Sequence, residues 1–258
     1  MSASMWCGIS DTARDPKPAV EPVRQAFLRV WAWLFVYSVS PFFNMPPISA
    51  RKTSMTLDQN RPTLRSQRLN QITHAPHEQL DKAVKAYAPF ETLAGYARFV
   101  VAQYLFQSEL QGLYNEPALQ AIISDLPARC RAEQAKADLA DLNMDTPLPV
   151  AGAVRSPGTA EALGWLFVSE GSKLGAAFLI KRAEALQLSD RFGARHLGEP
   201  AGGRAAGWKA FVNTLNELPL TAAQEAQLDQ GAIAAFERFN VLLQHAYADA
   251  PVTEMVQA

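Results

Sequence analysis

Apolar residues recur every three or four positions from Thr63 onward, which is the period of an amphipathic α-helix. No stretch alternates apolar and polar residues convincingly with the period of two that is typical of a β-strand. We therefore predict an all-α fold. The pattern indicates helices at about 63–87, 92–114, 116–124, 127–142, 156–188, 207–217 and 221–248.

Several predicted helix ends carry chemical signals. Thr92 and the Ser-Pro pair at 156–157 predict helix starts, because a hydroxyl accepts a hydrogen bond from a free backbone N–H and proline suits the first helical position. The segment 221–224 (Thr-Ala-Ala-Gln) is a capping box. Pro76 removes one backbone hydrogen bond from the first helix, so that helix either kinks there or begins its regular part near Thr73.

Three glycines occupy one face of the predicted helix 156–188, at Gly164, Gly171 and Gly175. Spacings of seven and eleven residues return to the same side of a helix with 3.6 residues per turn. Each interior glycine costs roughly 1 kcal/mol relative to alanine, so some other group must come close to this backbone. Two interpretations are open: a tightly packed second helix, or a flat ligand such as a porphyrin lying across the helix.

His77 is the candidate metal ligand on the first predicted helix, where it shares a stripe with Thr73, Leu80 and Val84. A histidine on an apolar face is most often a core residue with satisfied hydrogen bonds, and that interpretation stays open. Asp81 follows one turn later. There its carboxylate is placed to accept a hydrogen bond from one imidazole nitrogen and to orient the other nitrogen toward a metal.

Two glutamines interrupt the apolar inward face of the helix 92–114, at Gln103 and Gln107. They are one turn apart and therefore lie on the same side of the helix. Buried amides need hydrogen-bond partners or water. The pair either bonds to protein groups in the core or holds ordered water near a reaction centre.

The composition excludes several classes of function. The 258-residue chain has a net charge of −1, which provides no basic footprint for nucleic acid or an anionic membrane. Its two cysteines form no zinc, haem-attachment or redox motif, which fits a reducing cytoplasm. The sequence has no HExxH, GxSxG or Walker motif, and no histidine has a glutamate three residues before it, as a di-iron bundle requires.

Residues 1–54 differ in composition from the rest and are expected to lie outside the main domain, 55–258. They contain an apolar run at 30–43, which is shorter than the roughly 20 residues of a membrane-spanning helix. As a signal peptide the run would begin unusually late in the chain. Three interpretations are open: an upstream, non-native start before Met55, a membrane anchor, or a disordered or docking arm.

Three stretches resemble one known family. They are THAPHEQLD at 73–81, ARFVVAQYLFQ at 97–107, and ALGWLFVSEGSKLGAAFLIKRAEAL at 162–186, which is followed by GARHL at 193–197. The third stretch is long and specific. From about Leu64 to Tyr247 the chain closely resembles the bacterial haem oxygenases of iron-acquisition systems, the kind found in Pseudomonas and Neisseria, whereas residues 1–54 share no resemblance with them.

The resemblance implies a single helical domain in which haem lies between a proximal helix and a kinked distal helix. His77 falls on the proximal iron ligand, with Asp81 beside it. Residues on the distal side would be Gly171, Ser172 and Gly175, where glycine lets backbone and solvent approach the iron, together with Gln103 and Gln107 in a water network. Candidate contacts to the haem propionates, aligned more loosely, are Asn70, Lys85, Phe167 and Lys181. Some relatives carry tyrosine at the position of Phe167, and phenylalanine cannot make that bond.

The implied reaction opens haem to biliverdin and releases carbon monoxide and ferrous iron, with molecular oxygen as co-substrate. Haem would then be both substrate and cofactor. The chain has no flavin or nicotinamide motif, so electrons are expected from a ferredoxin or flavodoxin-type donor in the cytoplasm. Two alternatives stay open: a non-catalytic haem carrier or sensor with the same pocket, and a helical bundle unrelated to haem. The sequence leaves the cleaved meso position undefined.

Overall fold

Helices make up most of the protein. The computed structural model describes residues 63–154 and 156–248, which lie in one compact unit, Pro41–Ala258, so the predictions for residues 1–54 fall outside the described residues. The described helices are α2 (Arg65–Ile72), α3 (His74–Tyr87), α4 (Leu93–Tyr114), α5 (Pro117–Gln120), α6 (Leu126–Arg129), α7 (Ala132–Asp141), α8 (Thr159–Ala185), the 3-10 helix η1 (Arg195–Leu197), α9 (Arg204–Glu217) and α10 (Ala222–Tyr247).

The all-α prediction is confirmed. Over 63–154 and 156–248 the chain forms no strand, and its β-type pairing is limited to two isolated bridges within the turn 189–193. Thr92 caps α4 by accepting a hydrogen bond from the Gly95 N–H at 3.0 Å, and the capping box at Thr221 opens α10, as predicted. The first predicted helix is divided at Thr73, which leaves Pro76 in the first turn of α3, where a missing N–H breaks no helical bond.

Other boundaries differ from the prediction. Ser156 has a left-handed φ of 40° and cannot act as an N-cap, so α8 begins at Thr159 after Gly158. The helices predicted at 116–124 and 127–142 are broken into α5, α6 and α7, with Asp125 in a left-handed conformation between α5 and α6. The 3-10 helix η1 was not predicted, and α9 begins three residues earlier than the pattern indicated.

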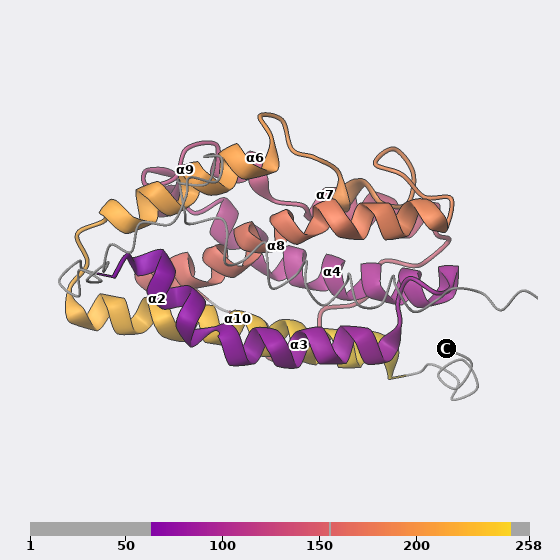
Figure 1. The fold of residues 1–258 in the computed structure, drawn as a ribbon, viewed down its shortest axis with the longest axis horizontal. Coiled ribbons are helices and arrows are strands. Elements are labelled where there is room, and N and C mark those ends of the chain that lie inside the picture. The colour runs from indigo at the N-terminus through magenta and orange to yellow at the C-terminus, as the bar shows by residue number, and fades with distance from the viewer. Residues whose placement is uncertain (1–62, 155, 249–258) are drawn as a thin grey trace, which may run out of the picture. The chain divides into compact units, whose positions relative to one another are not determined.

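α10 is the centre of the packing. Helices α8, α4, α3 and α2 contact it, while α7 packs on α4 and α9 packs on α8 (Figure 1). α3, α8 and α10 run in the same direction in this view, and α4 runs in the opposite direction. At the end of the bundle, Tyr87 stacks on Tyr247 at 4.3 Å between ring centroids, and the Tyr247 hydroxyl donates to the Gly95 carbonyl at 2.5 Å.

The closest approach of α8 to α10 involves two glycines. A Cβ atom on Gly164 would lie 2.1 Å from the Leu228 carbonyl oxygen, and one on Gly231 would lie 2.1 Å from the Glu161 carbonyl oxygen. No real side chain tolerates such a distance to backbone. Gly164 therefore serves helix packing, which is the first of the two interpretations given for the glycine stripe.

α8 is the one helix among the described residues that is long and apolar enough to cross a membrane, but half of its apolar window is buried inside the protein. Its buried face packs on α10 and α4. These contacts are those of a core helix. The apolarity of α8 therefore reflects its place between its neighbours.

Gly164→Ala is expected to lower the free energy of unfolding by about 1–3 kcal/mol, because the new methyl group forces α8 and α10 apart. Gly112→Ala on α4 is the matched control, since a Cβ there meets nothing within 4 Å. That variant should be stabilised by up to about 1 kcal/mol. Urea unfolding followed by circular dichroism measures both values. Equal effects in the two variants would contradict this account of the helix contact.

Candidate functional site

A series of aromatic contacts links His77 to Trp165 in the first third of α8. The His77 imidazole on α3 meets the Phe236 ring of α10 edge-on at 5.6 Å. One turn further along α10, Phe239 contacts Phe106 of α4 at 5.4 Å. Phe106 in turn lies 6.5 Å from Trp165 of α8. These ring contacts therefore connect two helices whose residues are almost ninety positions apart in the sequence.

Both helices have residues that are not fully buried. α3 has no fully buried side chain, and His77, Leu80 and Val84 are half-buried along its inward stripe. Burial in α8 is nearly continuous from Ala160 to Gly171, after which the segment 172–175 contains no buried residue. Figure 1 shows α8 and α10 separating toward their C-terminal ends.

The His77 imidazole is held in its neutral form. Burial lowers its pKa from the ordinary value of 6.5, and the charge of Asp81 opposes this with a smaller effect. The Asp81 carboxylate is itself paired with Lys85, one turn further along α3. The neutral form of imidazole is the one that binds metals, so a lowered pKa favours metal binding by His77 at neutral pH.

The two predicted glutamines behave differently. Gln107 is buried, and its Nε2 donates to Ser169 Oγ at 3.0 Å while its Oε1 accepts from the Arg131 N–H at 3.1 Å. It therefore fastens α4 to α8 and to the start of α7. Gln103 lies one turn earlier on α4 and is half-buried. Of the two, Gln103 has the exposure that contact with ordered water requires.

The glycines of α8 separate into two kinds. Gly164 is explained by the contact with α10. A Cβ on Gly171 would lie 3.5 Å from the edge of the Trp208 ring, which is an ordinary van der Waals distance, so packing alone permits alanine there. A helix-interior glycine costs about 1 kcal/mol relative to alanine. The described protein contacts therefore do not explain why position 171 is a glycine and not an alanine. A ligand that lies close to the backbone there would explain it.

The candidate propionate contacts do not form one group. Asn70 Oδ1, on α2, is buried and finds no hydrogen-bond donor in the described part of the chain, while Lys85, on α3, is paired with Asp81. Lys181 is largely exposed and bonds Glu184 at 3.0 Å. Phe167 is fully buried, with its ring 5.2 Å from that of Trp208. The surroundings of Phe167 are those of a core residue.

The sequence analysis missed two buried polar groups on α8 and α10. Trp165 Nε1 and Asn240 Oδ1 are buried without partners within the described ranges. Asn240 follows Phe236 by one turn on α10 and so lies on the side of the helix that meets His77. Neither residue could be recognised from the sequence, because a single tryptophan or asparagine in an amphipathic helix belongs to no motif.

A polar cluster on the other side of α8 was also missed. Tyr114 bonds both Ser169 and Glu170, and Glu170 is paired with Arg129 and Lys173. Ser169 and Glu170 are the only polar residues between Ala162 and Gly171. These two polar residues within an apolar run could have indicated the cluster, because a carboxylate that is buried there needs charged partners.

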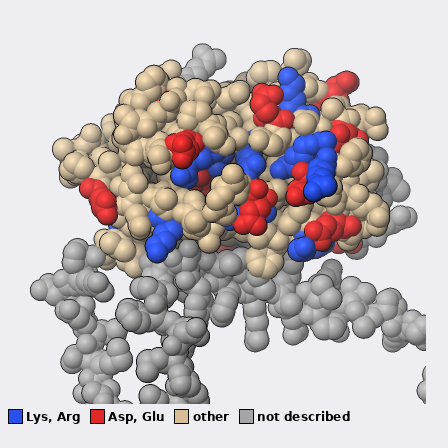
Figure 2. Space-filling model, turned by 90° about the horizontal axis from the view of Figure 1, so that it is seen from above, with Lys and Arg blue, Asp and Glu red and all other residues tan. Residues whose placement is uncertain are grey.

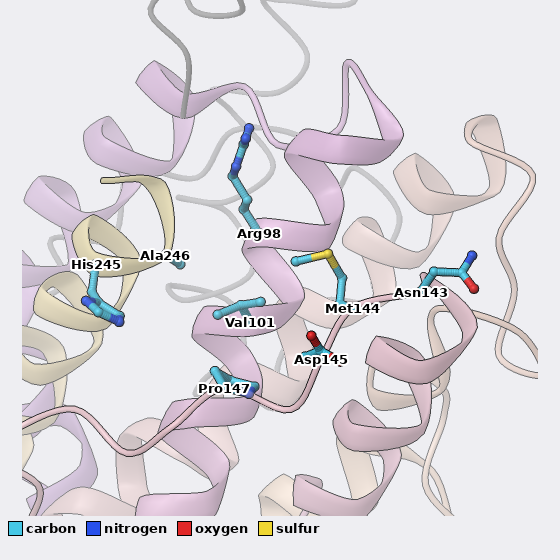
Figure 3. Close-up of a pocket in the computed structure, with 8 residues that line it drawn as sticks. All are labelled: Arg98, Val101, Asn143, Met144, Asp145, Pro147, His245 and Ala246. Carbon is cyan, nitrogen blue, oxygen red and sulfur yellow. The ribbon is translucent and has the colours of Figure 1, made fainter. Parts of the chain in front are cut away.

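A separate hollow of ≈ 430 Å³ lies where the start of α4 and the end of α10 meet the loop after α7 (Figure 3). None of the predicted site residues lines it; its walls are Arg98, Val101, Asn143, Met144, Asp145, Pro147, His245 and Ala246. Within 63–154 and 156–248, no three His, Cys, Asp or Glu side chains converge on a common metal position. His77 therefore stands as a single candidate ligand and not as part of a metal-binding cluster.

Comparisons with known proteins agree on one family. The family model described as heme oxygenase matches residues 64–245. The chain is similar to heme oxygenase PigA of Pseudomonas aeruginosa, with 51% identity over 194 residues, which cover 74% of this chain and 97% of that protein. It is also similar to a heme oxygenase of Xanthomonas campestris, with 38% identity over 101 residues, which cover 37% of this chain and 58% of that protein.

Among solved structures, the chain is similar to the NO- and CO-bound heme oxygenase of Neisseria meningitidis. The TM-score is 0.69 at 34% identity, and the match covers 74% of this chain and 96% of the other. The match supports the all-helical fold of the described residues. The family match spans most of the sequence, and a relative that is 51% identical is covered almost completely. The chain therefore belongs to the heme oxygenase family.

Proposed function

We propose that this protein opens haem to biliverdin and releases carbon monoxide and ferrous iron, with molecular oxygen as co-substrate. The observation that carries the proposal is a neutral, half-buried His77 on α3, in a bundle whose α8 leaves Ser172 and Gly175 unburied. A flat, largely apolar macrocycle matches two partly uncovered helix faces. The physiological role we propose is recovery of iron from haem.

The residues present fit haem. His77 would hold the iron through one ring nitrogen, and the neighbouring Asp81 charge would favour the orientation in which the other nitrogen carries the proton. The half-buried stripe of Leu80 and Val84 would cover one face of the ring. Asn70 has one buried, unpartnered amide end, and rotation of the amide would turn its N–H groups toward a propionate. Lys85 would add a positive charge nearby.

Bound haem supplies the iron centre at which oxygen and electrons react. The protein's own part is to hold that centre and to shape its distal side. Gly171 and Gly175 allow the α8 backbone to approach the ring closely. The Ser172 hydroxyl donates to the Ser169 carbonyl at 2.8 Å, which leaves the lone pairs of an exposed oxygen to accept hydrogen bonds from ordered water. Gln103 would contribute to the same water structure.

The reaction needs an external source of electrons. We propose a ferredoxin or flavodoxin-type donor, because the sequence has no flavin- or nicotinamide-binding motif. We also propose that the protein works in the cytoplasm. Its half-buried Cys130 is a free thiol whose pKa is raised by burial, which is compatible with a reducing compartment.

His77→Ala is expected to abolish the Soret shift that the wild type shows on anaerobic haem titration, because the variant lacks the iron ligand. Addition of oxygen with ascorbate or ferredoxin should then produce biliverdin in the wild type only, as measured by chromatography. His74→Ala is the matched control, since His74 is exposed on the same helix. It should leave the spectrum and the product unchanged.

Two outcomes would contradict the proposal. Haem binding through His77 without ring opening would indicate a carrier or sensor in place of an enzyme. No Soret change in the wild type would show that the protein does not bind haem, and would favour a helical bundle unrelated to haem. In that case Gly171 and Gly175 would need an explanation from packing.

Haem affinity is expected to stay constant as the pH falls from 8 to 6.5 and to decrease only below that range. Iron and the proton compete for the same imidazole nitrogen, and burial lowers the pKa of His77 from 6.5. Well below that lowered pKa, affinity should fall about tenfold for each pH unit. Haem titrations across the range test this, and a decline that begins above pH 7 would show that the pKa of His77 is not lowered.

The haem-free protein should show the corresponding change in stability. Because the folded-state pKa of His77 lies below its unfolded value, the unfolded chain takes up the proton first as the pH falls. The contribution of His77 to stability is therefore fully present above pH 6.5 and is lost as the pH falls through the lowered pKa. Urea unfolding at several pH values should show a weaker dependence in His77→Ala than in the wild type.

A further inference from the structure

A group of polar side chains lies on the side of α8 opposite the glycine stripe, and the proposed reaction leaves it without a role. It consists of Tyr114, Ser169 and Glu170, with Arg129 and Lys173 at its edge, and we call it the Tyr114 cluster. Tyr114 and Ser169 are completely buried, and the Glu170 side chain is 4% exposed. Figure 2 shows that basic and acidic side chains are interspersed on the face of the molecule that it views.

The hydrogen bonds of the cluster form a directed chain. Gln107 Nε2 donates to Ser169 Oγ at 3.0 Å, and the two hydroxyls of Ser169 and Tyr114 are 2.7 Å apart. The Tyr114 hydroxyl donates to Glu170 Oε1 at 2.9 Å. Since Ser169 accepts from the amide, it is free to donate to Tyr114. Gln107, Ser169 and Tyr114 therefore each give one bond and receive one, and Glu170 accepts at the end of the chain. Such chains strengthen cooperatively in a buried environment.

The charged side chains at the Glu170 end of this hydrogen-bond network are paired, but burying them costs free energy. Glu170 is paired with Arg129 at 3.3 Å and with Lys173, and burial lowers the pKa of Lys173 despite the attraction of Glu170. A buried ion group of this kind is often no more stabilising than apolar side chains of similar size. Stability alone is therefore a weak reason for its presence, and a geometric role explains it better.

The cluster holds the turn of α8 that precedes the distal residues. Tyr114 bonds two consecutive residues of that turn, and Gln107 bonds the first of them from a point two turns away on α4. The next residue is Gly171, which has no side chain to anchor it. The nearest atoms to its missing Cβ are the edge of the Trp208 ring at 3.5 Å. The backbone at 171–172 is therefore fixed mainly through Ser169 and Glu170.

We propose that Tyr114 is a positioning residue: through Ser169 and Glu170 it sets the distance of the Gly171–Ser172 backbone from bound haem. The inference rests on the proposed function. It predicts that loss of one hydroxyl, remote from the ring, loosens the distal turn without affecting His77. Haem binding would then stay intact while ring opening slows.

Tyr114→Phe is the first test, because it removes the hydroxyl and keeps the ring. Hydrogen exchange of the haem-free protein, followed by mass spectrometry, should show about tenfold faster exchange in the middle of α8. In the ferrous complex the carbon monoxide stretching frequency should shift and broaden. The kcat for haem should fall about tenfold with KM unchanged, as expected when a contact acts on the transition state and not on binding.

Tyr96→Phe is the matched control. Tyr96 is completely buried on the same helix, and its hydroxyl donates to the Gly193 carbonyl at 3.0 Å, away from the distal turn. This variant should lose comparable stability yet keep the wild-type carbon monoxide frequency and kcat. If both variants lose activity equally, Tyr114 is a structural residue only and the proposal is wrong.

Glu170→Gln separates position from charge, and it covers the case in which Tyr114→Phe fails to fold. The amide oxygen still accepts from Tyr114, whereas Arg129 and Lys173 lose a charged partner, so the variant should be less stable but keep its carbon monoxide frequency and most of its kcat. A large loss of kcat with an unchanged carbon monoxide frequency would overturn the proposal, because charge would then matter more than position. Absence of ring opening in the wild type would refute the proposed function itself, whereas wild-type turnover with an unaltered Tyr114→Phe refutes only the positioning role.

Discussion

The contact between α8 and α10 at Gly164 and Gly231 determines the geometry of the rest of the molecule. Two helices meet backbone to backbone there, because each presents a glycine where any side chain would collide with a carbonyl oxygen of the other. From this contact the two helices separate along their length, as Figure 1 shows. Beyond Gly171 the burial of α8 becomes intermittent, with Ala176, Leu179 and Ala183 still buried, and α3 has no fully buried side chain. The site that we propose for a flat ligand depends on this close helix contact and on the angle at which the helices cross.

In the site that we propose, the protein places few reactive groups on the distal side. His77 would contribute a neutral nitrogen because burial lowers its pKa, while α8 would contribute glycines and the Ser172 hydroxyl, whose proton is bonded to the Ser169 carbonyl. The charged and phenolic groups of the Tyr114 cluster are on the other side of α8, where they bond to the helix. In this proposal, acid-base groups are kept away from the ring while the backbone comes close to it.

Much of this arrangement follows from the sequence. The helical period, the Thr92 cap and the Thr221 capping box predicted elements that the structure contains, because those signals are local. The family assignment from the 73–81, 97–107 and 162–186 stretches is confirmed by the comparisons.

The sequence could not distinguish the surroundings of the individual glycines in the stripe. The helical period places Gly164 and Gly171 on one side, yet Gly164 meets the backbone of α10 whereas Gly171 meets the Trp208 ring. The Tyr114 cluster was likewise hidden, since its members are far apart in the chain and only folding joins them. The predicted cap at Ser156 failed because cap chemistry also requires an extended backbone, which residue type alone does not ensure.

The most direct test of the central claim is a crystal structure of the ferric haem complex. The account predicts that iron is bound by an imidazole nitrogen of His77 and that the opposite face of the ring lies against the α8 backbone at Gly171–Gly175. It also predicts that the bonds of Gln107, Ser169 and Tyr114 are retained. Iron bound by another residue, or haem seated in the hollow lined by Arg98 and His245, would contradict the account.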